Sequence, residues 1–480
     1  MSAGTQPWWA NAVVYQIYPR SFQDSDGDGI GDLAGIVRRL DHLAWLGVDA
    51  VWLSPIYPSP LADMGYDVAD HTAVAPEYGS LAELDELIAR AHGLGIRVLL
   101  DLVPSHTSIE HPWFRERPDW YVWSDDGPPN NWVASFGGPA WSRDERSGRW
   151  YLHSFYPEQP DLNWRNPEVR AEFGRIVRFW TERGVDGFRV DAIDRVMKDA
   201  RLRDDPPATE PFPFPAPAEY TALDHRHSVN DPEVGLALAA LREGAGDAFL
   251  VGEVYLQAAE LRPYLEHLDM VFAFELPHGP FEARRLRDVI ASSAALERIA
   301  WVLSNHDFPR LATRVGEPRA ALAAMLLLTL PGAAFVYQGD EIGMIDGTGA
   351  DPPIDRAGRD PHRHPMQWEP EPRGGFTEGE PWLGLTDPEE RSVAGQRGRE
   401  GSLLELHRVL IALRRELDGE FELVDAAPSV VAFRRGAHTI ALNLGDAPAP
   451  LPPGEVRLET GSGAAAGGRL APFAGVVLQE

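Results

Sequence analysis

Four short blocks of this sequence place ionisable side chains directly after runs of Val, Leu, Ile or Phe. The blocks are residues 101–106, 187–191, 252–253 and 304–307. Each preceding run has the length and composition of a buried strand. The carboxyl ends of parallel strands meet at one face of a (β/α)8 barrel, where enzymes of this architecture build their active sites. We therefore expect the four blocks to converge on one site.

Three carboxylates in these blocks suit the cleavage of a glycosidic bond. Arg189 and Asp191 are two residues apart and share a strand face, so the guanidinium should lower the pKa of Asp191 and keep it ionised, as a nucleophile requires. Glu253 has no cation beside it in the sequence, which suits a protonated general acid. Asp307 supplies a third carboxylate. Paired carboxylates about 5 Å apart hydrolyse glycosides with retention. Any one of these acids alone would also fit a salt-bridged or surface role.

Composition excludes several classes of function. With 73 acidic and 44 basic residues the formal net charge is −29, which argues against nucleic acids and anionic membranes as partners and favours a small neutral substrate. The chain has no Cys, and residues 1–8 have no basic and apolar signal segment, so we expect a cytoplasmic protein. The apolar run 320–337 is divided by Pro331 and Gly332, which favours a helix followed by a buried strand over a membrane span.

Strand and helix patterns alternate along most of the chain. This alternation predicts an α/β fold, a (β/α)8 TIM barrel formed by residues 1–104 and 167–418. Residues 105–166 break the pattern and predict a subdomain inserted after the third strand. Residues 419–480, with short apolar runs between Gly and Pro turns, predict a small antiparallel β domain. The Pro-rich segment 206–217 is expected to border the site. Strands are expected at 13–18, 50–53, 97–103, 185–190, 249–251, 299–303 and near 270 and 333, and helices at 36–46, 81–94, 167–183 and 403–417.

The order of motifs resembles the α-amylase family of retaining glycoside hydrolases. The motifs are DLVPSH at 101–106, GFRVDAID at 187–194, GEVY at 252–255 and SNHD at 304–307. QPDLN at 159–163, GDEIG at 339–343 and PMQW at 365–368 resemble the α-glucosidase and oligo-1,6-glucosidase branch of that family. The resemblance covers nearly the whole chain.

This resemblance implies a role for each matching residue. Asp191 would be the nucleophile, Glu253 the acid/base and Asp307 the carboxylate that binds and distorts the sugar. Tyr66 would stack on the terminal glucose, and Asp67 would hydrogen-bond it and pair with Arg363 to close the pocket. His106, Arg189 and His306 would contact the same ring, Asp101 would support the site, and Phe155 and Gln159 would line it. Ser105 stands where the family usually has Asn, which affects the expected local hydrogen bonding.

Near the N-terminus, an Asp- and Gly-rich loop has the oxygen spacing of a calcium site. Asp24, Asp26, Asp28 and Asp32 occupy loop positions one, three, five and nine, and the Ile30 carbonyl is available at position seven. The Glu expected at position twelve of an EF-hand is absent, so the loop resembles instead the single metal loop of the α-glucosidase branch. Structural Ca²⁺ is expected, with Mg²⁺ possible, and a metal-free turn is the alternative. We expect no organic cofactor, because no Gly-rich phosphate loop precedes a helix.

The expected activity is that of a retaining exo-acting α-glucosidase with transglucosylation. In the branch that the chain resembles, a small residue after the nucleophile accompanies α-1,4 cleavage and Val accompanies α-1,6 cleavage, so Ala192 favours maltose-type substrates. A glucosyltransferase or isomerase of the trehalose synthase or sucrose isomerase type would share the same residues, as would an α-1,6- or sucrose-preferring hydrolase. A non-catalytic barrel protein is disfavoured, because all three carboxylates and Arg189 are present. The oligomeric state stays open.

Overall fold

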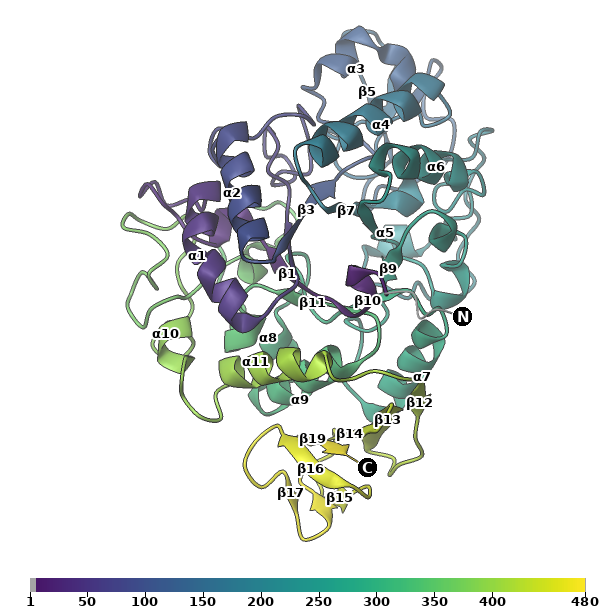
Figure 1. Ribbon diagram of the computed structural model, residues 1–480. Helices are drawn as coiled ribbons and strands as arrows, with labels where there is room; N and C mark the ends of the chain where they lie inside the picture. Colours follow the sequence, from purple (N-terminus) through teal and green to yellow (C-terminus); the bar gives the residue numbers. More distant parts are fainter. Residues whose placement is uncertain (1–5, 480) are drawn as a thin grey trace.

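The computed structural model describes residues 6–479 and contains a closed barrel of eight parallel strands. Neighbouring strands follow the order β1-β11-β10-β9-β8-β7-β3-β2, so β1 pairs with both β2 and β11 and closes the ring. Figure 1 shows the ring with helices around it. The predicted (β/α)8 fold is confirmed. The strands are β1 (Val13–Ile17), β2 (Ala50–Leu53), β3 (Arg97–Leu102), β7 (Gly187–Val190), β8 (Phe249–Gly252), β9 (Met270–Phe272), β10 (Ile299–Val302) and β11 (Ala333–Tyr337).

Side-chain caps set where several barrel helices begin. Asp32 accepts a hydrogen bond from the backbone N–H of Gly35, and so the first helix begins before the predicted residue 36. Ser80, Asn166 and Ser402 cap three further helices in the same way. The longer helices are α1 (Leu33–Leu46), α2 (Leu81–Gly93), α4 (Pro167–Glu182), α6 (Val234–Ala245), α7 (Ala283–Ala294), α9 (Glu317–Thr329) and α11 (Leu403–Arg414), and the shorter ones are α3 (Pro112–Glu116), α5 (Ala218–Thr221), α8 (Leu311–Val315) and α10 (Val393–Gln396).

The chain between β3 and α4 leaves the barrel and forms a subdomain, as predicted. It contains α3 and a small antiparallel sheet of β4 (Trp123–Ser124), β6 (Trp150–Leu152) and β5 (Trp141–Arg143). This subdomain lies at one end of the molecule in Figure 1. Its base returns to the end of β3 through an isolated bridge between His106 and Asp161. The insertion therefore adds side chains to the carboxyl end of the barrel.

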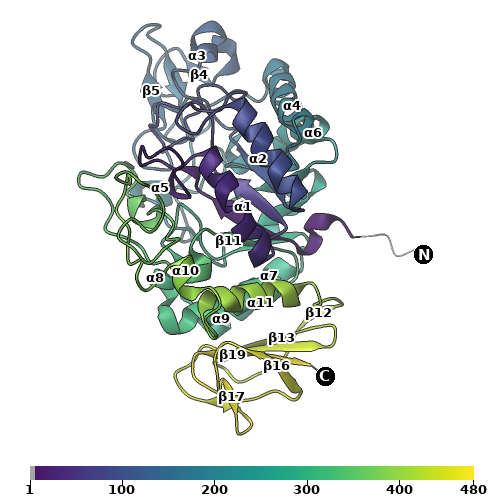
Figure 2. The same cartoon turned by 60° about the vertical axis from the view of Figure 1, so that its left-hand side comes forward.

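After α11 the chain forms two antiparallel sheets at the other end of the molecule (Figures 1 and 2). The larger sheet contacts α7 and α9. The run predicted to be a helix and a buried strand is α9 followed by β11, and in residues 6–479 no helix is long and apolar enough to cross a membrane. The larger sheet contains β12 (Phe421–Leu423), β13 (Val430–Arg435), β14 (His438–Asn443), β19 (Ala474–Gln479) and β16 (Glu455–Glu459), and the smaller one β15 (Ala449–Pro450), β18 (Arg469–Leu470) and β17 (Ala465–Ala466).

Candidate active site

Arg189 on β7 holds three carboxylates from neighbouring parts of the barrel. Its Nη1 lies 2.9 Å from Asp101 Oδ1 and 2.6 Å from Asp191 Oδ1, and its Nη2 lies 2.5 Å from Glu253 Oε1. The register of β3 and β7 places Asp101 opposite Arg189, and Glu253 directly follows the adjacent strand β8. All four side chains are buried. Three of the four predicted blocks therefore meet at one guanidinium.

Two electrostatic expectations for this cluster were wrong. Burial raises the pKa of Asp191 well above its ordinary value, and the opposing effect of Arg189 does not compensate, because Glu253 and Asp101 add like charge. Glu253 was expected to lack a cation, yet Arg189 contacts it directly. Burial also raises the pKa of Asp101 to about 7. One guanidinium thus faces three carboxylates, and a proton retained among them relieves the excess buried negative charge.

Ala192 connects the nucleophile candidate to the acid candidate through its backbone. Its N–H donates to Glu253 Oε2 at 3.0 Å, and the Ile193 N–H donates to the Glu253 backbone carbonyl at 3.2 Å. Ala192 has φ +40°, in the left-handed region that a side chain other than Gly rarely adopts. This sharp turn after Asp191 orients the Glu253 carboxylate.

The fourth block, after β10, joins the same site through His306 and Asp307. Asp307 Oδ1 accepts from Arg359 at 2.9 Å and from Arg363 at 3.2 Å, and its Oδ2 lies 3.2 Å from His306 Nε2. Burial acts to raise the pKa of Asp307, but His306, Arg359 and Arg363 outweigh it and hold that pKa below its ordinary value. The ring of Tyr66 stacks on His306 with a centroid distance of 5.4 Å. Asp307 is therefore ionised, and it lies between two guanidinium groups and the His306 ring.

The predicted pair between Asp67 and Arg363 does not form. The carboxylate of Asp67 accepts from the Ser59 hydroxyl at 2.7 Å and from backbone N–H groups, so it braces its own loop. Arg363 contacts Asp307 instead. The pair that does form joins Asp63 Oδ1 and Arg359 Nη2 at 2.5 Å. Each segment contains two residues of the same charge, and the pair is formed by the earlier one in each case. The sequence prediction named the later ones, Asp67 and Arg363.

The inserted subdomain contributes Phe155 and Gln159 to the site. Gln159 Nε2 donates to Asp63 Oδ2 at 3.0 Å and lies 2.9 Å from His106 Nε2. The Phe155 ring meets His106 edge-on at 5.1 Å. Ser105, the one departure from the family pattern, lies 2.7 Å from His106 Nδ1 and keeps a hydrogen bond at that position. Gln159 thus links the subdomain to the pair formed by Asp63 and Arg359.

These groups surround a cavity of about 940 Å³ at the carboxyl end of the barrel. Seven predicted residues line it, while Gln159, Arg189, His306 and Arg363 support them from behind, and Asp67 is not part of the wall. The Pro-rich segment 206–217 borders the cavity through Phe212 and Phe214. The predicted lining residues are Tyr66, His106, Phe155, Asp191, Ala192, Glu253 and Asp307, and those that sequence reasoning missed include Asp63, Phe136, Tyr255, His278, Phe308 and Arg359.

Residues 16–419 match the family described as alpha amylase, catalytic domain. The chain belongs to the α-amylase family. Its relatives include a probable alpha-glucosidase of Rhizobium meliloti, 41% identical over 89% of this chain and 87% of the relative. An oligo-1,6-glucosidase of Halalkalibacterium halodurans is 36% identical over 89% of this chain and 88% of the relative. The crystal structure of XgtA, an alpha-glucosyl transfer enzyme, matches with a TM-score of 0.93 at 39% identity, covering 99% of this chain and 100% of the other. This α-amylase family member is thus a glycoside hydrolase of the glucosidase branch.

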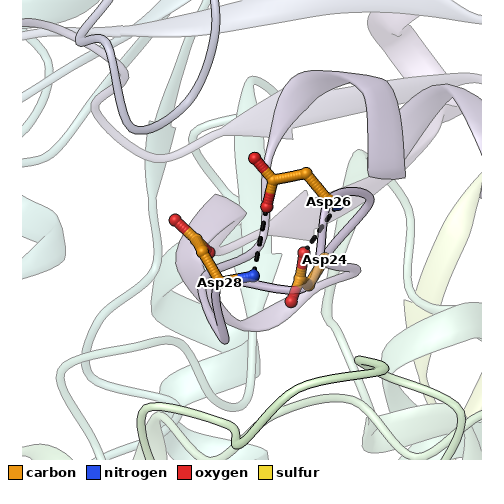
Figure 3. A group of neighbouring side chains, drawn as sticks. All are labelled: Asp24, Asp26 and Asp28. Carbon is orange, nitrogen blue, oxygen red and sulfur yellow. Dashed lines mark hydrogen bonds between the residues drawn. The ribbon is translucent and has the colours of Figure 1, made fainter.

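A second acidic group of this α-amylase family member lies apart from the cavity. Carboxylate oxygens of Asp24, Asp26 and Asp28 lie within 4.8 Å of one another. Figure 3 shows Asp24 accepting from the Asp26 N–H and Asp26 accepting from the Asp28 N–H, at 2.9 and 3.1 Å. Burial acts to raise the pKa of Asp24, but hydrogen bonds from Thr377 and Gly27 outweigh it and keep that pKa low. The three oxygens fit a hard cation that prefers oxygen ligands.

The other predicted metal ligands are not all placed in this group. Asp32 is outside this group of three. One of its carboxylate oxygens accepts from the Gly35 N–H at 2.6 Å and the other from the Ser25 N–H at 2.8 Å. Its observed role is to cap α1 and to fasten the start of the loop. Ile30 lies in the loop and donates its N–H to Asp28 Oδ1 at 2.7 Å. The role of Asp32 as a metal ligand stays a prediction beside this observed role as a cap.

Proposed function

We propose that this enzyme is a retaining, exo-acting α-glucosidase that releases terminal α-1,4-linked glucose from small neutral α-glucosides of the maltose type. The observation that carries the proposal is the position of Asp191 and Glu253 on the two terminal nitrogens of one guanidinium, at 2.6 and 2.5 Å. Arg189 thereby keeps the two carboxylates close together. Such closeness favours the short separation that retaining enzymes use over the wider spacing of inverting ones.

In the first step Asp191 attacks the anomeric carbon and Glu253 gives its proton to the departing oxygen. The glycosidic bond breaks, and a covalent bond forms between the sugar and Asp191. In the second step Glu253 takes a proton from water or from a second sugar, and the resulting oxygen displaces Asp191. The Ala192 N–H holds Glu253 Oε2 in place during both steps. Asp307, ionised beside Arg359 and Arg363, stabilises the positive charge that develops on the sugar ring.

The pair of Asp63 and Arg359 supports exo action. Arg359 contacts both Asp63 and Asp307, and Gln159 donates to the same Asp63 carboxylate. A charged pair fastened on several sides closes the cavity beyond the sugar that Asp307 binds. A chain end then fits the site, whereas the middle of a long polysaccharide does not.

The choice of linkage and of acceptor is the finer part of the proposal. Ala192 lines the cavity beside Asp191 and leaves room that Val would fill, which supports α-1,4 over α-1,6 cleavage. Transfer to a sugar acceptor is the alternative outcome of the second step, and the similarity to the alpha-glucosyl transfer enzyme XgtA favours a measurable share of it. An isomerase would use the same residues and retain the released sugar as its own acceptor.

One experiment separates these activities. The enzyme is incubated with maltose, isomaltose, sucrose and trehalose, and the products and the anomer first released are followed by NMR. Glucose released from maltose as the α-anomer, with oligosaccharides at high substrate concentration, supports the proposal. A β-anomer excludes retention, and an isomeric disaccharide as the main product favours the isomerase.

We also propose that Asp24, Asp26, Asp28 and the Ile30 carbonyl hold a structural Ca²⁺, with Mg²⁺ as the alternative ion. The three carboxylate oxygens converge, and all the donors are oxygens. The ion would neutralise like charges that otherwise repel. Elemental analysis of the purified protein identifies the ion, and a protein free of both ions after dialysis against each would overturn this assignment.

A further inference from the structure

His278 lines the active-site cavity without a hydrogen-bond partner. It lies in the loop between β9 and α7, and only 8% of its surface is exposed. Within residues 6–479, neither ring nitrogen makes a hydrogen bond; Nε2 is fully buried, whereas Nδ1 is not. A buried polar atom without a partner is unfavourable, and such groups in native proteins call for an explanation.

The loop that carries His278 is braced on both sides. Arg314 donates to the Pro277 carbonyl at 2.5 Å, and Arg285 donates to the Pro280 carbonyl at 3.3 Å and also to the Glu275 carbonyl. Two arginine side chains thus hydrogen-bond to backbone carbonyls of the segment that carries His278. Braced loops of this kind hold a binding side chain in one position before the ligand arrives.

Aromatic rings form the surroundings of His278. The imidazole meets Phe308 edge-on at 4.4 Å and lies 5.5 Å from Phe214 and 6.5 Å from Tyr255. Phe308 directly follows Asp307, and Tyr255 lies two residues after Glu253. Among residues 6–479, no hydrogen bond or cation–π contact joins this aromatic wall to Asp63 or Arg359, which pair with each other at another part of the lining. The cavity therefore has a polar wall for the glucose that is cleaved off and an aromatic wall for the group on the other side of the bond.

The histidine is neutral in this setting. Burial lowers the pKa of His278 to about 4, and the positive charges of Arg314 and Arg285 add to the effect. A neutral imidazole offers one N–H donor and one acceptor, which match a hydroxyl group. Aromatic rings at the same wall suit the apolar faces of a sugar ring. A sugar, with hydroxyls on its edge and C–H groups on its faces, has both features.

We infer that His278 is a positioning residue whose Nδ1, the ring nitrogen that is not fully buried, hydrogen-bonds a hydroxyl of the leaving sugar, or of the acceptor sugar in transfer. This inference rests on the proposed α-glucosidase function and adds to it the residue that selects a sugar on the leaving-group side. Water as the acceptor needs no such contact. His278 therefore favours transfer to sugars over hydrolysis.

The test compares maltose with phenyl α-glucoside, whose leaving group carries no hydroxyl before cleavage. His278→Phe keeps the ring and removes both nitrogens, and we expect it to lower kcat/KM for maltose about 3- to 10-fold, the effect of one neutral hydrogen bond. The value for phenyl α-glucoside should stay unchanged. His278→Asn retains a donor and an acceptor near the Nδ1 position and should recover most of the loss with maltose.

A second readout does not depend on the amount of folded enzyme. With phenyl α-glucoside as donor and glucose as acceptor, His278→Phe should lower the ratio of transfer to hydrolysis. His71→Phe is the matched control, because His71 is also buried with an unpartnered nitrogen but does not line the cavity. It should leave the ratio unchanged.

The outcomes separate this inference from the function on which it rests. Equal losses for both substrates, or an unchanged transfer ratio in His278→Phe, would mean that His278 only packs in the wall and would overturn the inference alone. A wild-type enzyme that cleaves neither substrate would overturn the α-glucosidase proposal and the inference with it.

Discussion

Arg359 and Asp63 form a largely buried ion pair between two loops that are far apart in sequence, with 2.5 Å between Nη2 and Oδ1. Arg359 extends the same contact to Asp307 at 2.9 Å and is itself held by Asp355 at 2.7 Å. One guanidinium thus connects the closed end of the cavity to a carboxylate of the proposed catalytic set. Sugar binding at that end and charge stabilisation by Asp307 depend on the same side chain.

Arg359→Ala should therefore lower kcat/KM for maltose by a factor on the order of 10² or more, because truncating one partner of a buried charge pair costs about 2 to 5 kcal/mol. Steady-state kinetics test this, and a melting curve shows whether the variant is folded. Arg90→Ala is the control, since Arg90 pairs with Asp41 in an exposed bridge. If Arg359→Ala loses no more activity than Arg90→Ala, the pair does not bind the sugar.

Asp191→Asn should remove nearly all turnover, by a factor on the order of 10⁴ or more, because an amide cannot form the covalent intermediate. Asp288→Asn, an exposed change on α7, is the matched control and should keep wild-type activity. Single-turnover kinetics detect residual cleavage. An Asp191→Asn variant with more than a small fraction of wild-type activity would assign the nucleophile to another carboxylate.

The barrel and the catalytic carboxylates could be predicted from sequence because each depends on a local pattern. Short apolar runs form the strands, and the strand ends bring Asp191, Glu253 and Asp307 to one face. The contacts of Arg189 were only partly predictable. Its effect on Asp191 followed from strand periodicity, but its contact with Glu253 depends on the alignment of β7 with β8. The sequence predicted buried strands but not the burial of the Asp191 carboxylate itself, which reverses the expected pKa shift of Asp191.

Other parts of the site could not be predicted because the residue type has more than one common role. Asp32 has a spacing that suits a metal ligand, yet an Asp before a helix is also a preferred cap, and the cap is what the structure shows. Asp67 and Arg363 have the charges of the pair that closes the cavity, but long-range packing selects Asp63 and Arg359. No sequence pattern pointed to His278, because its lack of a hydrogen-bond partner can be seen only in the structure.

Ala192→Val should shift the preference from maltose toward isomaltose, changing the ratio of the two kcat/KM values by about 10- to 200-fold, because it fills space beside the leaving sugar. The structure adds a second expectation. At φ +40° a β-branched residue is strained, so the variant should also melt at a lower temperature. Ala192→Gly, which tolerates this φ and removes a methyl group, is the matched control. An unchanged ratio in Ala192→Val, or a wild type that already prefers isomaltose, would contradict the proposed linkage.

Asp101 should make the free energy of unfolding depend on pH. Burial raises its folded pKa to about 7, above the ordinary value of about 4, so between these values the folded state binds more protons than the unfolded state. The contribution of Asp101 to stability is therefore fully present below pH 4 and is lost as the pH rises through 7. Urea denaturation measures the free energy of unfolding of the wild type and of Asp101→Asn. Relative to Asp101→Asn, the wild type should lose stability as the pH rises from 4 to 7. A constant difference would contradict the raised pKa.

Chelation should lower the melting temperature without stopping the chemistry, because the loop of Asp24, Asp26 and Asp28 is separate from the cavity. An ion present at about 100 times its Kd stabilises the folded state by about 2.7 kcal/mol, so EDTA should shift the transition by a measurable amount. Calorimetry with and without EDTA measures the shift, and activity below the transition should persist. In Asp26→Ala with Asp28→Ala, EDTA should have no effect on the melting temperature. An equal shift in that double variant would place the ion elsewhere, and no shift in the wild type would leave the loop an ordinary turn.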